Sequence, residues 1–279
     1  MAILLLKKSY QLKDLKEKKF NDLWNSNGVF TTMRVIGKPV KILFLEDHLN
    51  NFFKSIKDYK IKKKNIEKNI KKIIKININK EKKYDHLFRV AVNHKMISVS
   101  LRKRLKIKSN FSLKLINYKR IDPEYKNLKY KKILENLKKI NTTKTDIALH
   151  NGKNILETGT SNLLFVKKDK IYSPTNGFYK GTTLRFFSKK LKKIIKKSIP
   201  IDSLNDYDEI IVIGSGKGVV SVSHIKEPYW RRKSLKNYRI LSNIYEKAVT
   251  NCPRYNGWSI ILSVLKTFKG KEINHVFNK

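Results

Sequence analysis

The sequence predicts a mixed α/β or α+β protein with two domains. At 279 residues the chain is long enough for one large or two modest domains with a buried core. Strand-like and helix-like runs alternate through both halves of the chain, which is typical of mixed folds. The segment 121–130 (IDPEYKNLKY) contains a proline and several charges, as a connection between domains often does. We therefore expect a small N-terminal α/β domain at 1–120, a linker at 121–125 and a larger C-terminal domain at 126–279.

The N-terminal half begins with MAILLL, which is too short for a secretory core or a membrane span and indicates a strand. The stretch 28–46 (GVFTTMRVIGKPVKILFLE) predicts two strands that turn at Gly37–Pro39. HLNNFFKSIKDY and 60–76 predict helices. The second has isoleucines at helical spacing between lysines, which favours a helix packed on a sheet over a polyanion- or membrane-surface helix. Strand character returns in 86–101.

The C-terminal half continues the alternation. The run 111–121 is strand-like, and YKKILENLKKI after the linker is helical. Residues 146–174 predict strands with a turn at Asn151–Gly152. A helix is expected over 182–199 (TTLRFFSKKLKKIIKKSI), followed by the strand that begins after Asp208.

The net charge of +42 is extreme, but its composition argues against a dedicated nucleic-acid protein. Only ten of the 64 basic residues are arginine, and the lysines are spread along the whole chain. Nucleic-acid readers usually add arginines for bidentate contacts and aromatic side chains for stacking. The lysine excess therefore indicates a compositional bias, and we expect no specific nucleic-acid partner. A lysine-rich nucleic-acid-binding protein is the alternative from another functional class.

The single cysteine, Cys252, excludes an internal disulfide and argues against a cysteine-rich metal site. A chain of this kind is typical of a reducing compartment. We find no transmembrane segment, and we expect a soluble, cytoplasmic protein that binds no metal.

The stretch 210–222 (IIVIGSGKGVVSV) is a strand-like run followed by three glycines and a lysine. Glycines in this arrangement let a backbone approach a phosphate closely. The P-loop pattern fails because Ile211 stands at its first glycine and Gly218 at its last position. The GxGxxG pattern fails because Val219 stands at its third glycine. The stretch therefore indicates a phosphate site that matches neither nucleotide motif.

A second informative stretch is ILETGTSNLLFV (155–166), in which Glu157 ends a strand-like run. Taken alone, such a carboxylate is about as often a simple hydrogen-bond acceptor in a turn as a functional residue. Several other segments occur with it in a fixed order: GVFTTMRV, LEDHL, IYSP, KGTTLR and YDEIIVIGSGKGVVSV. Together they resemble the class IV (fold-type IV) pyridoxal-phosphate aminotransferases, which include branched-chain and D-amino-acid aminotransferases and aminodeoxychorismate lyase. The resemblance runs from residue 24 to residue 245.

The resemblance implies a fold-type IV enzyme with pyridoxal 5'-phosphate at the interface of its two domains. It places the Schiff-base lysine at Lys126, 31 residues before Glu157, with Lys129 as the alternative. Lys126 would also be the general base that moves the substrate's α-proton. Glu157 would lie beside the pyridine nitrogen and keep it protonated. The residues expected at the phosphate are Thr182, Thr183, Gly214, Ser215 and Gly216.

The chain departs from the family pattern at three places. Asn51 stands where the family usually has the arginine that grips the phosphate, and Lys54, one helical turn on, is a possible substitute. Arg185 is displaced by one position, and Ser221 replaces a proline. Lys217, within the glycine turn, is expected to be one of the many surface lysines.

The resemblance leaves two reactions open. FTTMRV resembles the lyase version of the first motif, because Thr31 stands where the aminotransferases typically carry glutamate. We expect Thr31, Thr32 and Arg34 on the substrate side. Aminodeoxychorismate lyase, which releases p-aminobenzoate and pyruvate for folate biosynthesis, is the first expectation, and a branched-chain or D-amino-acid aminotransferase is the alternative. The substrate is a small amino compound in either case, and the family implies a homodimer.

Overall fold

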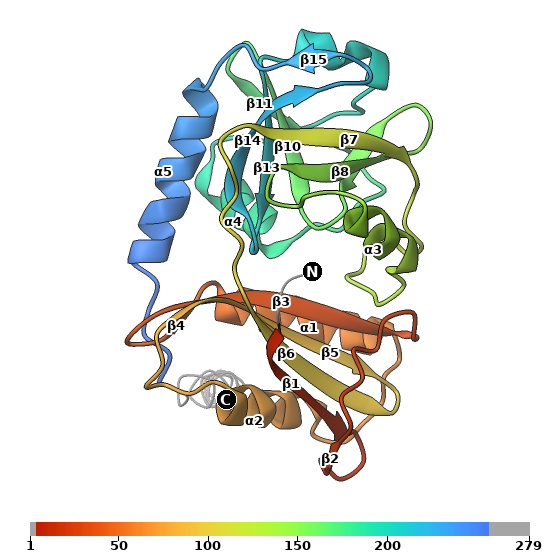
Figure 1. Ribbon diagram of the computed structural model, residues 1–279, viewed down its shortest axis with the longest axis vertical. Coiled ribbons are helices and arrows are strands. Elements are labelled where there is room, and N and C mark those ends of the chain that lie inside the picture. The colour runs from red at the N-terminus through yellow and green to blue at the C-terminus, as the bar shows by residue number, and fades with distance from the viewer. Residues whose placement is uncertain (1–3, 257–279) are drawn as a thin grey trace, which may run out of the picture.

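The computed structural model describes residues 4–256 of the chain. It contains two β-sheets, which lie one above the other in Figure 1 and are joined by the segment that follows β6. The mixed α/β class expected from the sequence is confirmed.

The first sheet is antiparallel throughout, with the strand order β2-β1-β6-β5-β3-β4. Its strands are β1 (Leu4–Gln11), β2 (Glu17–Lys18), β3 (Gly28–Gly37), β4 (Lys41–Ile42), β5 (Tyr84–Asn93) and β6 (Met96–Lys103). The turn predicted after β3 forms as expected, and Gly37 adopts a φ of 76° there, a conformation that favours glycine.

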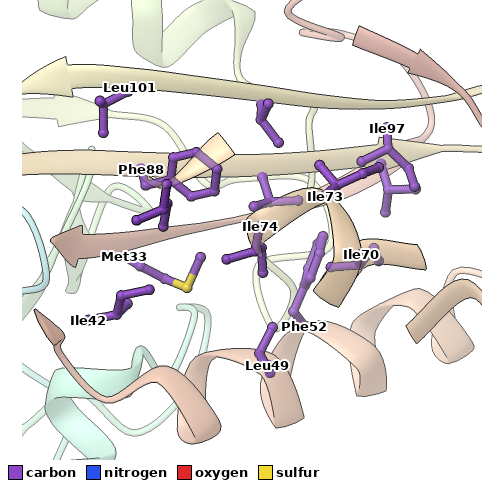
Figure 2. Close-up of a cluster of buried hydrophobic side chains, with 14 of the residues drawn as sticks. Met33, Ile42, Leu49, Phe52, Ile70, Ile73, Ile74, Phe88, Ile97 and Leu101 are labelled. Atoms are coloured by element: carbon purple, nitrogen blue, oxygen red, sulfur yellow. The ribbon is translucent and has the colours of Figure 1, made fainter. Parts of the chain in front are cut away.

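Two helices, α1 (Leu45–Asp58) and α2 (Ile66–Asn77), cover one face of this sheet. Figure 2 shows Leu49 and Phe52 of α1 and Ile73 of α2 packed with Met33 of β3 and Phe88 of β5. The prediction of a helix packed on a sheet with its lysines outward is confirmed for α2. Because strand side chains alternate between faces, the intervening residues of β3 and β5 point to the opposite side, toward the second sheet.

The second sheet has nine strands and mixes parallel and antiparallel pairs in the order β12-β11-β10-β13-β14-β7-β8-β9, with β15 beside β14. Its strands are β7 (Phe111–Asn117), β8 (Thr145–His150), β9 (Ile155–Thr158), β10 (Asn162–Lys167), β11 (Lys170–Ser173), β12 (Ile195–Lys196), β13 (Glu209–Gly214), β14 (Gly218–Ile225) and β15 (Trp230–Arg231). The accompanying helices are α3 (Lys131–Lys138), α4 (Thr182–Lys190), the 3₁₀ helix η1 (Ile201–Asp206) and α5 (Lys236–Thr250).

Alternating side chains of β10 and β13 enter two separate cores. On one face, Phe165 and Val212 pack with side chains of β7 and β14. On the other face, Leu164 and Ile211 pack against α4 and α5. Both strands are therefore apolar on both faces, which explains their continuous hydrophobic runs in the sequence.

One predicted element is wrong in extent. The helix expected over 182–199 ends at Lys190, and Ile195–Lys196 form β12 instead, because the edge of β11 offers parallel pairing to them. Tertiary pairing overrides the helical tendency of this lysine- and isoleucine-rich stretch.

The chain changes sheets between Lys103 and Phe111, because β7 pairs with β8 and β14 rather than with β6. This change of sheet lies before the linker that we expected at 121–125. The limits of the two domains are therefore still a prediction. At the other end, Tyr255 returns to the first sheet, where its N–H donates to the carbonyl of Val40 at 2.7 Å. The remaining C-terminal residues, 257–279, lie outside the described part.

Candidate active site

Lys126 lies where the two sheets meet. Its carbonyl accepts a hydrogen bond from the N–H of Phe30 in β3 at 2.9 Å, so the segment before α3 is attached to the first sheet. Its Nζ is 4.9 Å from the centre of the Phe30 ring and 5.4 Å from that of Tyr179. Burial, followed by the positive charge of Arg120, lowers the pKa of Lys126 to about 8. By contrast, Lys129 pairs with Asp122 at 3.2 Å nearer the surface.

A buried ion pair lies beside this lysine. Nε of Arg120 is 2.7 Å from Oε1 of Glu157, and the two side chains are 1% and 6% exposed. The two remaining nitrogens of Arg120 donate to the carbonyls of Pro123 at 2.7 Å and Tyr125 at 3.1 Å. Arg120 therefore joins the backbone just before Lys126 to the end of β9. Burial raises the pKa of Glu157, and the guanidinium opposes this effect.

His48 of α1 connects three further elements. Its Nδ1 hydrogen-bonds with Oγ1 of Thr31 at 2.9 Å and lies 3.4 Å from Oγ1 of Thr182, the first residue of α4. Its Nε2 hydrogen-bonds at 3.1 Å with Oγ of Ser215, in the turn between β13 and β14. Burial, followed by the charge of Lys126, lowers the pKa of His48 to about 3, so the imidazole is neutral near pH 7.

Polar residues of the turn 214–218 and of the start of α4 lie around His48, and we call this group of residues the cup. A Cβ at Gly214 would lie 2.7 Å from Oγ of Ser161, so any other residue here would displace the Ser161 side chain. Oγ1 of Thr183 is buried and has no hydrogen-bond partner among residues 4–256. The first N–H groups of α4 point out of its N-terminus, where an anion is favoured.

The family departures have clear positions. Nδ2 of Asn51 is 3.5 Å from Oγ1 of Thr182, so it stands at the cup without a charge. Lys54 is exposed on α1. The Nε of Arg185 donates to the carbonyl of Lys180 at 3.1 Å. Ser221 accepts a hydrogen bond from Arg232 at 3.0 Å.

The three substrate-side candidates do not lie together. The hydroxyl of Thr31 lies on the helix side of the first sheet, where it hydrogen-bonds with His48. Thr32 is on the opposite face, beside Phe30 and paired with Arg89 of β5. Arg34 is on that same face, where its Nη2 lies 3.9 Å from Asp85. Their roles remain predictions.

Lys217 differs from our expectation of a surface lysine. Its Nζ is 2.9 Å from Oδ2 of Asp146, and the two side chains are 12% and 1% exposed. The same amine donates to Oγ1 of Thr160 at 2.6 Å. Lys217 therefore ties the turn 214–218 to β8 and to the loop after β9.

A family model described as amino-transferase class IV matches residues 28–225, well over half of the chain. The chain belongs to the class IV aminotransferase family. The match confirms the resemblance found in the motifs, and with it a pyridoxal-phosphate-dependent enzyme.

Several solved aminotransferases share this fold. The T.th. branched-chain amino acid aminotransferase with N-(5'-phosphopyridoxyl)-L-glutamate is 18% identical, with a TM-score of 0.70 over 92% of this chain and 98% of that one. The branched-chain aminotransferase of Thermoproteus uzoniensis with norvaline is 16% identical, with a TM-score of 0.64 over 86% of this chain and 93% of that one. A PLP-bound hypothetical aminotransferase from Mycobacterium tuberculosis is 13% identical, with a TM-score of 0.64 over 87% of this chain and 98% of that one. No curated protein sequence matches the chain significantly.

The residues of the cup fit the phosphate of this family's cofactor. The unpartnered hydroxyl of Thr183 and the hydroxyl of Ser215 are hydrogen-bond donors. The charge of Glu157 acts on the amine of Lys126, so the structure brings these two predicted residues close together. In residues 4–256, no group of three or more His, Cys, Asp or Glu side chains is placed to hold a metal ion.

Sequence reasoning on this class IV aminotransferase missed Arg120, His48 and Tyr179. The available signals were an arginine six residues before the chosen lysine and a histidine in the LEDHL segment. Neither signal identifies a partner, because Arg120 meets Glu157 across 37 positions and His48 meets Ser215 across 167.

Proposed function

We propose that this enzyme removes the α-proton of a small amino substrate, with Lys126 as the attachment point of pyridoxal phosphate and as the base. The observation that carries the proposal is the position of the Lys126 amine. It lies between the rings of Phe30 and Tyr179, has a pKa lowered to about 8, and is adjacent to the Arg120–Glu157 pair. An amine with such a pKa is partly neutral near pH 7 and can act as nucleophile and base.

When bound, pyridoxal phosphate supplies an electron sink for the bonds at the substrate's α-carbon. Glu157 would hold a proton at the pyridine nitrogen, and Arg120 fixes the orientation of its carboxylate. Ser215, Thr182 and Thr183 would bind the phosphate through hydroxyl and backbone donors. The rings of Phe30 and Tyr179 exclude water from the amine of Lys126.

The substrate that we favour carries a carboxylate that can reach Arg89. Arg89 lies on the site-facing side of β5, and its guanidinium stacks 3.8 Å from the centre of the Trp24 ring. Its Nη2 donates to the carbonyl of Asp22, whereas its Nε is buried without a hydrogen-bond partner in the described residues. A free donor of this kind favours a carboxylate.

We therefore propose aminodeoxychorismate lyase activity, as FTTMRV suggests, because its substrate bears two carboxylates. An aminotransferase is the second candidate, supported by the aminotransferase structures that share the fold. The test is to incubate the purified enzyme with aminodeoxychorismate and, separately, with an amino acid and 2-oxoglutarate. Release of p-aminobenzoate supports the lyase. Transfer of the amino group without p-aminobenzoate would overturn the lyase in favour of the aminotransferase.

By the same family resemblance we propose a cytoplasmic homodimer. Part of the site would then be completed by the second subunit. Light scattering during size-exclusion chromatography measures the mass, and a monomer with full activity would contradict this proposal. As a separate finding, no helix within residues 4–256 is long and apolar enough to cross a membrane.

A further inference from the structure

Arg104 hydrogen-bonds with two backbone carbonyls of the turn 214–218. Arg104 follows β6 directly and belongs to the connection between the two sheets. Its Nε donates to the carbonyl of Gly216 at 2.9 Å, and its Nη2 donates to the carbonyl of Lys217 at 3.0 Å. The side chain is only 17% exposed. Two successive peptide groups of the turn are therefore oriented by one guanidinium.

This orientation matters because a trans peptide group points its C=O and its N–H in opposite directions. With the carbonyls of Gly216 and Lys217 facing Arg104, the following N–H groups point away from it. The turn is rich in glycine, and Gly218 adopts a φ of 77°. Glycines can exchange such conformations at low cost. Without Arg104, carbonyl oxygens could rotate toward the anion held by the cup and repel it.

Arg104 also supplies charge at a place where α1 supplies none. Asn51 occupies the position expected for a phosphate-binding arginine, and Lys54 is exposed. Behind the turn, Arg104 and Arg34 each lie 3.9 Å from the same carboxylate oxygen, Oδ1 of Asp85. The two guanidinium groups share this carboxylate, and the carboxylate of Glu246 also acts on the charge of Arg104. The guanidinium of Arg104 itself lies directly against the backbone of the turn.

We propose that Arg104 is a positioning residue for the cofactor's phosphate. It orients the peptide groups of the turn 214–218 and places behind them the positive charge that Asn51 does not provide. The inference rests on the proposed binding of pyridoxal phosphate at this cup. It assigns no chemical step to Arg104 itself.

The test compares pyridoxal phosphate with pyridoxal, which lacks the phosphate, in titrations of the apoprotein. We expect Arg104→Gln to raise the Kd of pyridoxal phosphate about tenfold, the loss of one charge-assisted interaction, while the Kd of pyridoxal changes less than about twofold. Arg104→Lys keeps the charge but not the paired hydrogen bonds, and should fall between the two. Lys57→Gln is the matched control, because Lys57 is an exposed lysine near the end of α1, and it should leave both Kd values unchanged.

Equal losses for the two ligands, or unchanged affinity for pyridoxal phosphate in Arg104→Gln, would overturn the inference. So would a phosphate-specific loss in Lys57→Gln as large as that in Arg104→Gln. Thermal melting of the apoprotein verifies that each variant is folded. If Arg104→Gln does not fold, the ratio of the two Kd values in Arg104→Lys decides the question by the same criteria. A wild-type protein that binds neither ligand would instead refute the proposed function.

Discussion

Nε of Arg120 lies 2.7 Å from Oε1 of Glu157, and the same guanidinium binds the backbone that leads to Lys126. The residue proposed to act at the pyridine nitrogen and the residue proposed to carry the cofactor are thus connected through one side chain. Each member of this group can therefore be tested by a substitution or a titration of its own.

Glu157→Gln should leave pyridoxal phosphate bound but lower turnover by roughly two orders of magnitude or more. The amide keeps the shape of the carboxylate but cannot stabilise a proton on the pyridine nitrogen. Steady-state kinetics together with the absorbance of bound cofactor check this. Near-normal turnover would remove Glu157 from the assigned role.

Arg120→Met should cost about 3–5 kcal/mol of unfolding free energy, because it leaves Glu157 buried without its partner. The double variant Arg120→Met/Glu157→Gln should recover part of this loss, since no unpaired charge remains. Urea denaturation of the apoproteins measures both. If the double variant is less stable than Arg120→Met, the buried ion pair is not the cause of the loss.

The lowered pKa of Lys126 predicts a pH dependence. The folded pKa of about 8 lies below the ordinary lysine value of 10.5, so the amine loses its proton earlier in the folded protein. The rate at which apoprotein and pyridoxal phosphate combine covalently should rise with pH up to about 8 and then level off. The same shift makes folding more favourable as pH rises from about 8 toward 10.5. A combination rate that continues to rise beyond about pH 10, the range of an unshifted lysine, would contradict the assigned environment.

His48 makes a prediction at lower pH. Its folded pKa of about 3 lies below the ordinary histidine value of 6.5, so the unfolded chain binds a proton that the folded protein does not. Stability should therefore fall as pH drops below about 6.5, and His48 should account for about 2 kcal/mol of the loss between about pH 7 and about pH 5. Urea denaturation at the two pH values measures it, with His48→Asn as the comparison. An identical pH dependence in both proteins would show that His48 is not neutral in the folded state.

Lys217→Met should destabilise the protein by about 3–5 kcal/mol, because Asp146 is almost fully buried and would lose its ionic partner. The matched control is Lys189→Met, which removes an exposed lysine from its 3.3 Å pair with Asp47 and should cost less than about 1 kcal/mol. Thermal or urea unfolding compares the two. Similar costs would mean that the Lys217 pair is solvated, as the sequence first suggested.

The sequence predicted the alternation of strands and helices and the family, because both depend on local pattern and on the order of motifs. It selected Lys126 by position alone. It could not predict Arg120 or His48, whose partners are far away along the chain. The prediction of a helix over the whole of 182–199 was wrong for the same reason, because Ile195 forms a strand only through its pairing with the edge of β11.

The most direct test of the proposed function is to locate the lysine that carries the cofactor. The protein loaded with pyridoxal phosphate is reduced with borohydride, digested, and its peptides are identified by mass spectrometry. The proposed role of Lys126 predicts a pyridoxyl group on that residue and none in Lys126→Ala. Modification centred on Lys129 or on another lysine, with Lys126 unmodified, would contradict it.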